Sequence, residues 1–207
     1  MTIEGTNRKG MKTKKILVEA AAKCIARDGI HFTSFQSIAI QSGIAQPLVV
    51  YHFKNKENIF VEVWNHIYTE ALKQTEQMLD LTTTATEKLL SYMKISINFF
   101  SKTSEVTRIY YQLHFLSMFD SSMKQINTQI KRKAVQRIAS IILQGQRNNE
   151  FNNSVDPNLI AKVVHGGLVG LLLNSVTEFE DYELQVLLLE FQDTIIRSLT
   201  VLKFNNE

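Results

Sequence analysis

Glycine and proline are scarce in this chain, and this scarcity limits the possible folds more than any other feature of the sequence. Only 8 Gly and 2 Pro occur among 207 residues. A β-sandwich or β-barrel needs a turn signal about every 8–12 residues, so the sequence disfavours both. Apolar residues make up 44% of the chain, and they recur at the three- and four-residue spacing of amphipathic helices. The sequence therefore predicts an all-α fold with about nine helices.

Positive charge is concentrated in the first quarter of the chain. Residues 1–56 hold nine Lys or Arg against three Asp or Glu, a net charge of +6, whereas the whole chain carries +3. A basic head on a mildly acidic body is typical of nucleic-acid-binding proteins. A solvated basic arm would have the same charge, so the order of the helices has to decide between the two interpretations.

Several kinds of site are missing from the sequence. The single cysteine, Cys24, cannot form an intramolecular disulfide, and no group of Cys and His has the spacing of zinc ligands. We therefore expect no metal and no cofactor. The N-terminus is polar and basic, so we expect no secretory signal and a cytoplasmic protein. The most apolar segment, 159–173, is short for a membrane span and contains Lys162 and His165.

The basic quarter begins with the pattern of one long helix followed by a short one. Residues 1–11 lack apolar periodicity and are expected to form a disordered arm. A first helix is expected from Lys14 to the cap at Gly29. Thr33 is the expected N-cap of a second helix, with Gln36 as its capping-box partner.

A tight turn at Gly43 then leads into a third helix. Pro47 lies in the first turn of that helix, where its missing N–H is not needed, and Val49 and Phe53 are expected to face the core. Two short helices joined in this way behind a longer helix form a helix-turn-helix. Further helices are expected from Lys56 to about 78 and over 86–102, 104–118, 121–148, 157–179 and 182–203.

The stretch from Ile16 to Phe60 resembles the DNA-binding head of the TetR family of bacterial transcription regulators. The matching residues are IL at 16–17, AA at 20–21, CI at 24–25, Gly29, Thr33, IA at 38–39, SGIAQP at 42–47, HF at 52–53, Lys56 and IF at 59–60. Val50 stands where the family has a tyrosine, so either Tyr51 replaces its phosphate contact or the contact is absent. Ala45 replaces a common serine, which weakens the side-chain cap of the third helix.

The third helix is the expected DNA-reading element. An α-helix fits the major groove, and residues near its N-terminus reach the base edges. Gln46 can pair bidentately with adenine, while Thr33, His52 and Lys56 are expected phosphate contacts. The alternative is that these are solvated polar residues with capping roles. The expected DNA-binding residues are Thr33, Ser34, Gln36, Ala45, Gln46, Pro47, Leu48, Tyr51, His52 and Lys56.

Residues 92–119 are unusually rich in aromatic side chains. Core packing alone could explain them, but the family resemblance implies a ligand cavity in the C-terminal domain. Ligand pockets are mostly apolar with a few polar anchors. The expected ligand-binding residues are Trp64, Tyr68, Asn98, Tyr111, Gln112, His114, Phe115, His165 and Asn174.

The last two helices carry the expected dimer interface. Three glycines fall within five residues of one helix, and each costs about 1 kcal/mol relative to alanine, so a close helix approach has to compensate. The resemblance implies that these helices pair across a two-fold axis into a four-helix bundle, although packing within one subunit would also explain the glycines. The expected interface residues are Gly166, Gly167, Gly170, Ile195 and Leu199.

These patterns together predict a DNA-binding domain over 1–56 and a ligand-binding and dimerisation domain over 57–207. The predicted function is a homodimeric repressor that binds a palindromic operator in double-stranded DNA and is released by a small apolar or aromatic ligand. Control by a protein partner, or no effector at all, remains an alternative. An enzyme is a remote alternative, because the sequence contains no G-x-S-x-G turn, no metal-ligand spacing and no phosphate loop.

Overall fold

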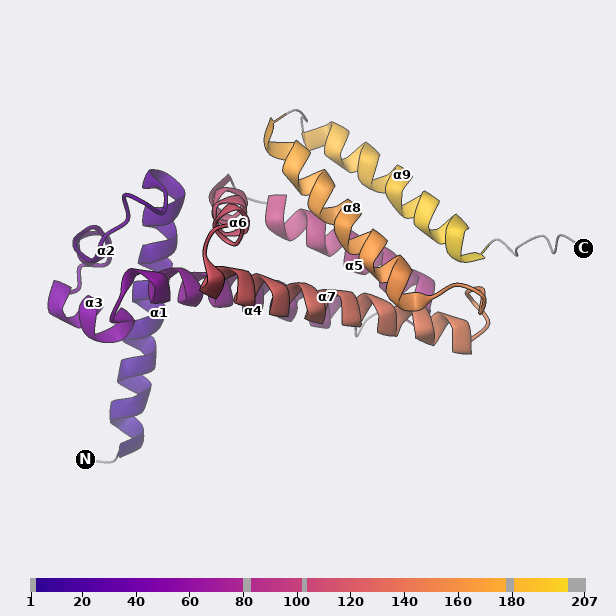
Figure 1. The fold of residues 1–207 in the computed structure, drawn as a ribbon. Helices are drawn as coiled ribbons and strands as arrows, with labels where there is room; N and C mark the ends of the chain where they lie inside the picture. The colour runs from indigo at the N-terminus through magenta and orange to yellow at the C-terminus, as the bar shows by residue number, and fades with distance from the viewer. Residues whose placement is uncertain (1–2, 80–82, 102–103, 178–180, 201–207) are drawn as a thin grey trace, which may run out of the picture. The chain divides into compact units, whose positions relative to one another are not determined.

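The structure, a computed structural model, describes residues 3–79, 83–101, 104–177 and 181–200 (Figure 1). Nine regular elements occur within these ranges, and all are α-helices, so the predicted all-α fold of about nine helices is confirmed. In chain order the helices are α1 (Ile3–Asp28), α2 (Phe35–Ser42), α3 (Gln46–Phe53), α4 (Lys56–Leu79), α5 (Ala85–Ser101), α6 (Ser104–Leu116), α7 (Ser121–Arg147), α8 (Pro157–Thr177) and α9 (Asp181–Thr200).

The chain divides into two compact units, and each combines two separate stretches of sequence. The first unit contains Met1–Glu70 and Thr103–Lys124, and the second contains Ala71–Lys102 and Gln125–Glu207. Helix α6 therefore folds together with α1, α2 and α3, although it follows α5 in the chain. The predicted functional boundary after residue 56 remains a prediction.

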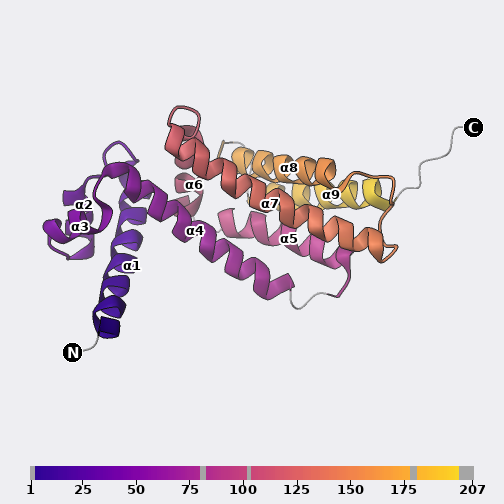
Figure 2. The same cartoon turned by 60° about the horizontal axis from the view of Figure 1, so that its bottom comes forward.

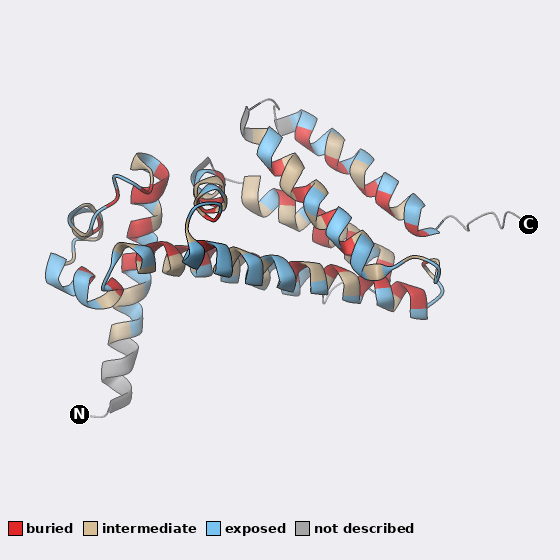
Figure 3. Cartoon of the chain, in the orientation of Figure 1, coloured by how far each residue is buried: buried red, intermediate tan, exposed pale blue. Residues whose placement is uncertain are grey.

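The core of the first unit is built from apolar residues at helical spacing. Leu17, Ala21 and Cys24 are fully buried along one face of α1 (Figure 3), and burial raises the pKa of the Cys24 thiol. Val49 and Phe53 of α3 are also fully buried, as predicted. The burial of these two residues fixes which side of α3 faces outward.

Two glycines end the first two helices. Gly29 follows α1 with φ +83°, and Gly43 follows α2 with φ +68°, a region of backbone conformation that is open to glycine without steric cost. Pro47 lies in the first turn of α3, and its N-cap Ala45 makes no side-chain hydrogen bond. Helices α2 and α3 lie next to each other in both views (Figures 1 and 2), so the predicted helix-turn-helix is confirmed.

The sequence predicted the start of α8 correctly and the start of α1 incorrectly. Helix α8 begins as predicted at Pro157, because the Asp156 carboxylate accepts a hydrogen bond from the Asn158 N–H at 2.7 Å. Helix α1 begins at Ile3, so the predicted disordered arm over 1–11 is wrong from Ile3 onward. The weak apolar pattern of this segment did not prevent a helix from extending toward the N-terminus.

The core of the second unit is formed by α5, α7, α8 and α9. Its buried apolar residues include Leu89, Met93 and Ile97 of α5, Ile138 and Ile142 of α7, Val164 and Leu168 of α8, and Leu184 and Leu188 of α9. The Glu150 carboxylate caps α5 by accepting hydrogen bonds from the backbone N–H groups of Ala85 and Thr86 at 2.9 and 3.0 Å. The buried Gln192 side chain joins α9 to α5 by donating to the Leu90 carbonyl at 2.8 Å.

Three of the five predicted dimer-interface residues point into this unit. Ile195 is 4% exposed and Leu199 is fully buried, so neither can meet a second subunit without repacking. A Cβ at Gly167 would lie 2.6 Å from Cε2 of Phe191 in α9, so Gly167 allows α8 and α9 to approach within one chain. The dimer-interface prediction is therefore wrong for Gly167, Ile195 and Leu199.

Helix α8 also has an exposed apolar face. A Cβ added at Gly166 or Gly170 would meet no atom within 4 Å, so close packing inside the subunit does not explain these two glycines. Leu159, Val163 and Leu173 are 57%, 55% and 52% exposed and continue this face at helical spacing. By length and composition alone α8 could cross a membrane, which is weak support for a membrane role. A place for Gly166 and Gly170 in a dimer interface remains a prediction.

Candidate nucleic-acid interface

The outward face of α3 carries the side chains that the sequence predicts to read DNA. Gln46, Pro47, Leu48 and Tyr51 are exposed, while Val49 and Phe53 turn into the core of the first unit. The carboxamide, the apolar groups and the phenol are therefore all open to a ligand. Ala45 precedes them as the exposed N-cap residue.

Tyr51 is well placed to act where the family tyrosine is missing. Its side chain is 74% exposed, whereas Val50 is 38% exposed and carries no polar atom. The Tyr51 ring stacks edge-on against the half-buried His52 ring, with 5.4 Å between the ring centroids. The contact holds the two rings on adjacent parts of the helix surface. Replacement of the family tyrosine by Tyr51 remains a prediction.

The start of α2 is capped by a pair of serines. The Ser34 hydroxyl accepts a hydrogen bond from the Ser37 N–H at 3.1 Å, and the Ser37 hydroxyl accepts one from the Ser34 N–H at 2.9 Å. This is the reciprocal arrangement of a capping box, with serine in the place expected for Gln36. The predicted capping role of Gln36 is therefore wrong, but the exposed Ser34 and Gln36 remain available to DNA.

Thr33 has a different role from the one predicted. It is fully buried, and its hydroxyl donates a hydrogen bond to the Gly29 carbonyl at 2.9 Å. The N-cap prediction is wrong by one residue, and a buried hydroxyl cannot reach a phosphate group. Thr33 therefore stabilises the turn between α1 and α2 and does not belong to the DNA-contacting set.

Lys56 is the first residue of α4, and Asn55 caps that helix. The Asn55 side chain accepts a hydrogen bond from the Asn58 N–H at 2.8 Å. The Lys56 ammonium donates to the backbone carbonyl of His31 at 2.6 Å, so it reaches back to the α1–α2 turn. An ammonium has three protons, and a phosphate contact by Lys56 therefore remains a prediction.

Charges elsewhere on this unit are partly paired. Arg27, in the last turn of α1, donates two hydrogen bonds of 2.7 Å to the Asp28 carboxylate, and these hydrogen bonds lower the pKa of Asp28. Lys14 pairs with Glu62 at 2.6 Å. Exposed ion pairs contribute little to stability, so their main effect is to reduce the positive charge on the side of α1 where they lie.

The comparison with protein families agrees with this geometry. Residues 17–63 match the family model described as bacterial regulatory proteins of the tetR family. Over these 47 residues the chain resembles the tetR family of bacterial regulatory proteins. The matched residues run from the buried face of α1 through the helix-turn-helix to the first turns of α4, which is the segment that builds the outward face of α3.

Relatives and solved structures resemble the chain over most of its length. The fatty acid metabolism regulator protein of Bacillus subtilis is 23% identical over 171 residues, covering 83% of this chain and 87% of the relative. A transcriptional regulator from Saccharomonospora viridis, solved with choline, has a TM-score of 0.82 and 19% identity, covering 93% and 100% of the two chains. FadR from Bacillus subtilis, solved with stearoyl-CoA, has a TM-score of 0.80 and 19% identity, covering 89% and 98%. These structures share the fold of this chain.

An aromatic cluster joins α4 to α6 within the first unit. The Trp64 ring is 4% exposed and lies 5.6 Å from the Tyr110 ring and 6.4 Å from the His114 ring. The Tyr110 hydroxyl is 3.1 Å from Nε2 of His114. The half-buried Tyr68 and Tyr111 belong to the same two helices. Trp64, Tyr68, Tyr111 and His114 are therefore predicted ligand-binding residues on these two helices, which also carry Gln112 and Phe115.

The other predicted ligand-binding residues do not gather at one place in either unit. Phe115 is 58% exposed and packs on Phe119 with 5.1 Å between ring centroids. Asn98 and Asn174 are exposed and His165 is half-buried, and all three belong to the second unit. Because neither compact unit contains all nine residues, the ligand-binding set remains a prediction.

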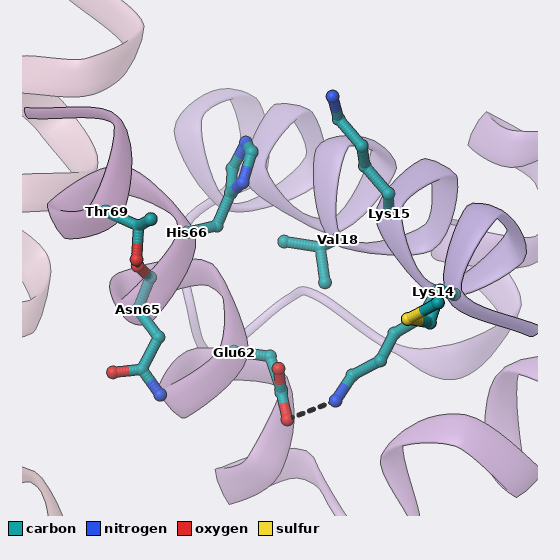
Figure 4. Close-up of a pocket in the computed structure, with 8 residues that line it drawn as sticks. Lys14, Lys15, Val18, Glu62, Asn65, His66 and Thr69 are labelled. Atoms are coloured by element: carbon teal, nitrogen blue, oxygen red, sulfur yellow. Dashed lines mark hydrogen bonds and ion pairs between the residues drawn. The ribbon is translucent and has the colours of Figure 1, made fainter. Parts of the chain in front are cut away.

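Helices α1 and α4 line an open pocket of about 310 Å³ in the first unit (Figure 4). Lys14 and Glu62 pair at its edge, and Figure 4 shows His66 and Val18 between Thr69 and Lys15. The lining residues are Met11, Lys14, Lys15, Val18, Glu62, Asn65, His66 and Thr69. None of the nine predicted ligand-binding residues lines this pocket, and most of its lining residues are polar or charged.

Gln112 is the residue whose role the sequence analysis missed most clearly. It was expected to anchor a ligand, but both ends of its carboxamide bind the backbone at the end of α1. Its partners are more than eighty residues away in the chain, so no local pattern could have indicated them. The capping role of Ser37 was also missed, although its position three residues after Ser34 is a usable signal.

Proposed function

We propose that this chain is a homodimeric transcriptional repressor that binds a palindromic operator, acts in the cytoplasm, and is released from DNA by a small ligand with a large apolar part. It would act by binding alone and catalyse no reaction. The observation that carries this proposal is the outward face of α3. Gln46, Leu48 and Tyr51 are exposed there while Val49 and Phe53 anchor the helix, as a helix that enters the major groove requires.

Each outward residue has a distinct expected contact. Gln46 lies in the first turn of α3, where its carboxamide can bind N6 and N7 of adenine. Leu48 can pack on a thymine methyl group. Tyr51 and His52 follow one turn later and suit phosphate contacts, which orient the protein on the duplex. Ser34 lies at the N-terminus of α2, where backbone N–H groups and the helix dipole favour a phosphate.

Selection of bound sites from random double-stranded DNA tests this function. A two-fold dimer should select an inverted repeat, with half-site centres about 34–36 Å apart, or one turn of DNA. The same protein should bind a scrambled duplex with an affinity at least about a thousandfold lower. Selection of no common motif, or of a single half-site bound by a monomer, would refute the proposal.

The dimer surface that we propose is the exposed face of α8 and α9. On α8 it contains Leu159, Val163, Gly166, Gly170 and Leu173, and on α9 it contains Tyr182, Val186 and Leu189. These residues recur at alternating spacings of four and three, the spacing that lets two helices interlock. Two such faces related by a two-fold axis would form a four-helix contact, with each residue used twice.

A membrane is the other apolar environment that could cover α8. Lys162 is exposed on this helix, and an isolated lysine is costly at the centre of a bilayer. Sedimentation equilibrium should show a dimer, and flotation with lipid vesicles should leave the protein in the soluble fraction. A monomer that floats with the vesicles would overturn the proposed dimer surface.

The ligand that we propose carries an apolar chain or ring. Two neighbours in fold were solved with stearoyl-CoA and with choline, and a relative is named a fatty acid metabolism regulator. The aromatic cluster around Trp64 supplies apolar surface with a nearby imidazole and phenol. Stearoyl-CoA, which carries an apolar chain, is therefore the compound to test, and choline, which carries none, is the comparison.

Binding can be followed through Trp64, which is the only tryptophan in the chain. A compound that releases operator DNA should change its emission, and operator DNA should weaken binding of the compound by the same factor. Release of DNA without this reciprocal effect would exclude ligand linkage. If neither compound changes operator affinity, control by a protein partner becomes the favoured alternative.

A further inference from the structure

We infer that Gln112 of α6 and Lys56 of α4 clamp the α1–α2 turn, residues 29–33, and that this clamp sets operator affinity by holding the start of α2. Both are positioning residues, because they act on DNA through the turn. The effect on operator affinity rests on the DNA binding proposed above. The clamp itself is a property of the free protein and can be tested without DNA.

Gln112 binds the turn with both ends of its side chain. Its Oε1 accepts a hydrogen bond from the Ile30 N–H at 2.8 Å, and its Nε2 donates to the Ile25 carbonyl at 3.2 Å. The Ile25 carbonyl also accepts from the Gly29 N–H at 2.9 Å. Because Ile30 is 4% exposed, loss of Gln112 would leave its N–H buried without this acceptor.

Lys56 holds the next residue of the turn. Its ammonium lies 2.6 Å from the His31 carbonyl oxygen, a short distance typical of a charge-assisted hydrogen bond. This bond connects the first residue of α4 to the turn that precedes α2. Two adjacent residues of the turn, Ile30 and His31, are therefore each held by a side chain from a different helix.

A displacement of the α1–α2 turn would also move the start of α2. The Thr33 N–H and hydroxyl both donate to the Gly29 carbonyl, at 3.2 and 2.9 Å, so the turn is closed on itself. Ser34 follows at once and caps α2 with Ser37. Only Phe32 and Thr33 separate the clamped positions from Ser34, and Ser34 and Gln36 at this helix start are proposed DNA contacts.

Amide hydrogen exchange tests the clamp in the full-length protein without DNA. Gln112→Met keeps the side-chain length but removes both hydrogen bonds, and should speed exchange of the Ile30 amide about tenfold or more. Gln192→Met is the matched control, because Gln192 is also a buried amide that bonds a backbone carbonyl, but in the second unit. It should leave Ile30 exchange unchanged. Unchanged exchange at Ile30 in Gln112→Met would overturn the clamp.

A second variant keeps the test decisive if Gln112→Met fails to fold. Gln112→Glu keeps an acceptor for the Ile30 N–H but turns a carboxylate oxygen toward the Ile25 carbonyl. It should protect Ile30 partly while exchange at Gly29 increases, because Gly29 shares the Ile25 carbonyl. If the Ile30 and Gly29 amides each exchange at the same rate in this variant as in the wild type, the clamp is also overturned.

Operator binding at several salt concentrations tests the consequence for DNA. Gln112→Met should weaken binding about five- to tenfold with an unchanged slope of log affinity against log salt. Lys56→Gln should also weaken binding without a change in slope. Loss of a phosphate contact would instead lower the slope by about 0.9 for each subunit, and that result would remove Lys56 from the clamp.

The two proposals can fail separately. If the wild type selects no DNA sequence, the proposed function fails, while Ile30 exchange still decides whether Gln112 holds the turn. If the wild type binds its operator and Gln112→Met binds it equally well, the link between the clamp and operator affinity is refuted.

Discussion

Leucine substitutions at two neighbouring glycines of α8 should separate subunit packing from dimer formation. In Gly167→Leu the new side chain would point at the Phe191 ring, whose Cε2 lies 2.6 Å from the added Cβ. Overpacking costs about 1–3 kcal/mol, and better helix propensity returns about 0.5–1 kcal/mol. We expect a net loss of about 1–2 kcal/mol in subunit stability, which lowers Tm by about 2–8 °C.

Gly170→Leu should have the opposite effect on the subunit. No atom lies within 4 Å of a Cβ at Gly170, so the subunit should gain about 0.5–1 kcal/mol of helix stability. At a two-fold interface the leucine would enter twice and cost about 2–6 kcal/mol. A cost in that range raises the dissociation constant of the dimer roughly 30-fold or more.

Sedimentation equilibrium and thermal unfolding followed by circular dichroism separate the two effects. Both should be measured over a range of protein concentrations, because dissociation makes Tm depend on concentration. We expect Gly170→Leu to be a helical monomer, and Gly167→Leu to be a less stable protein that still dimerises. A dimeric Gly170→Leu, or a stable monomeric Gly167→Leu, would refute the assignment of the two faces.

Three further predictions concern single contacts. Ser34→Ala should lower the free energy of unfolding by about 0.5–2 kcal/mol, and Gln36→Ala should leave it nearly unchanged in urea denaturation, because Ser34 is the cap. Gly145→Ala should destabilise the protein by about 1–3 kcal/mol, since its Cβ would lie 2.9 Å from Cγ of the buried Phe151; an unchanged Tm would contradict this packing. Burial opposes ionisation of Glu150, but hydrogen bonds from Ala85 and Thr86 outweigh it and lower the pKa. The stability that this cap contributes should be present above about pH 4.5 and lost as the pH falls through the folded-state pKa. The urea midpoint of the wild type should therefore fall over this pH range, and Glu150→Gln should reduce that dependence on pH.

Local signals in the sequence predicted most of the helices and their ends. Gly43 and Asp156 act within a few residues of their own positions, and Pro47 lies in the first turn of α3, so their effects can be inferred without knowing the fold. The capping error at Thr33 has a local cause as well. Thr33 and Ser34 are adjacent hydroxyl residues, and only the buried contact of Thr33 with the Gly29 carbonyl decides which of them caps α2.

The faces of α9 could not be assigned from its sequence. This helix has a buried apolar stripe that includes Leu188, Ile195 and Leu199, and an exposed one that includes Val186 and Leu189. Helical periodicity identifies both stripes but does not indicate which of them packs within the subunit. Ile195 and Leu199, which were predicted for the dimer interface, belong to the buried stripe, and only the position of α8 distinguishes the two stripes.

Contacts between distant parts of the chain are the remaining features that could not be predicted from the sequence. Gln112 is one of several polar residues in an aromatic segment, and its sequence neighbours give no sign of a bond to Ile30. The buried ring of Trp64 likewise meets Tyr110 and His114 of α6. Such pairs depend on how α6 folds against the head, which periodicity does not encode.

Selection of bound sites with the wild type and with Gln46→Ala tests the central claim, that the outward face of α3 reads DNA. The wild type should select an inverted repeat. The variant should select the same repeat with one base position relaxed in each half-site, at a cost of about 1–3 kcal/mol for each changed contact. An unchanged motif in the variant, or a uniform loss of preference at every position, would contradict the claim.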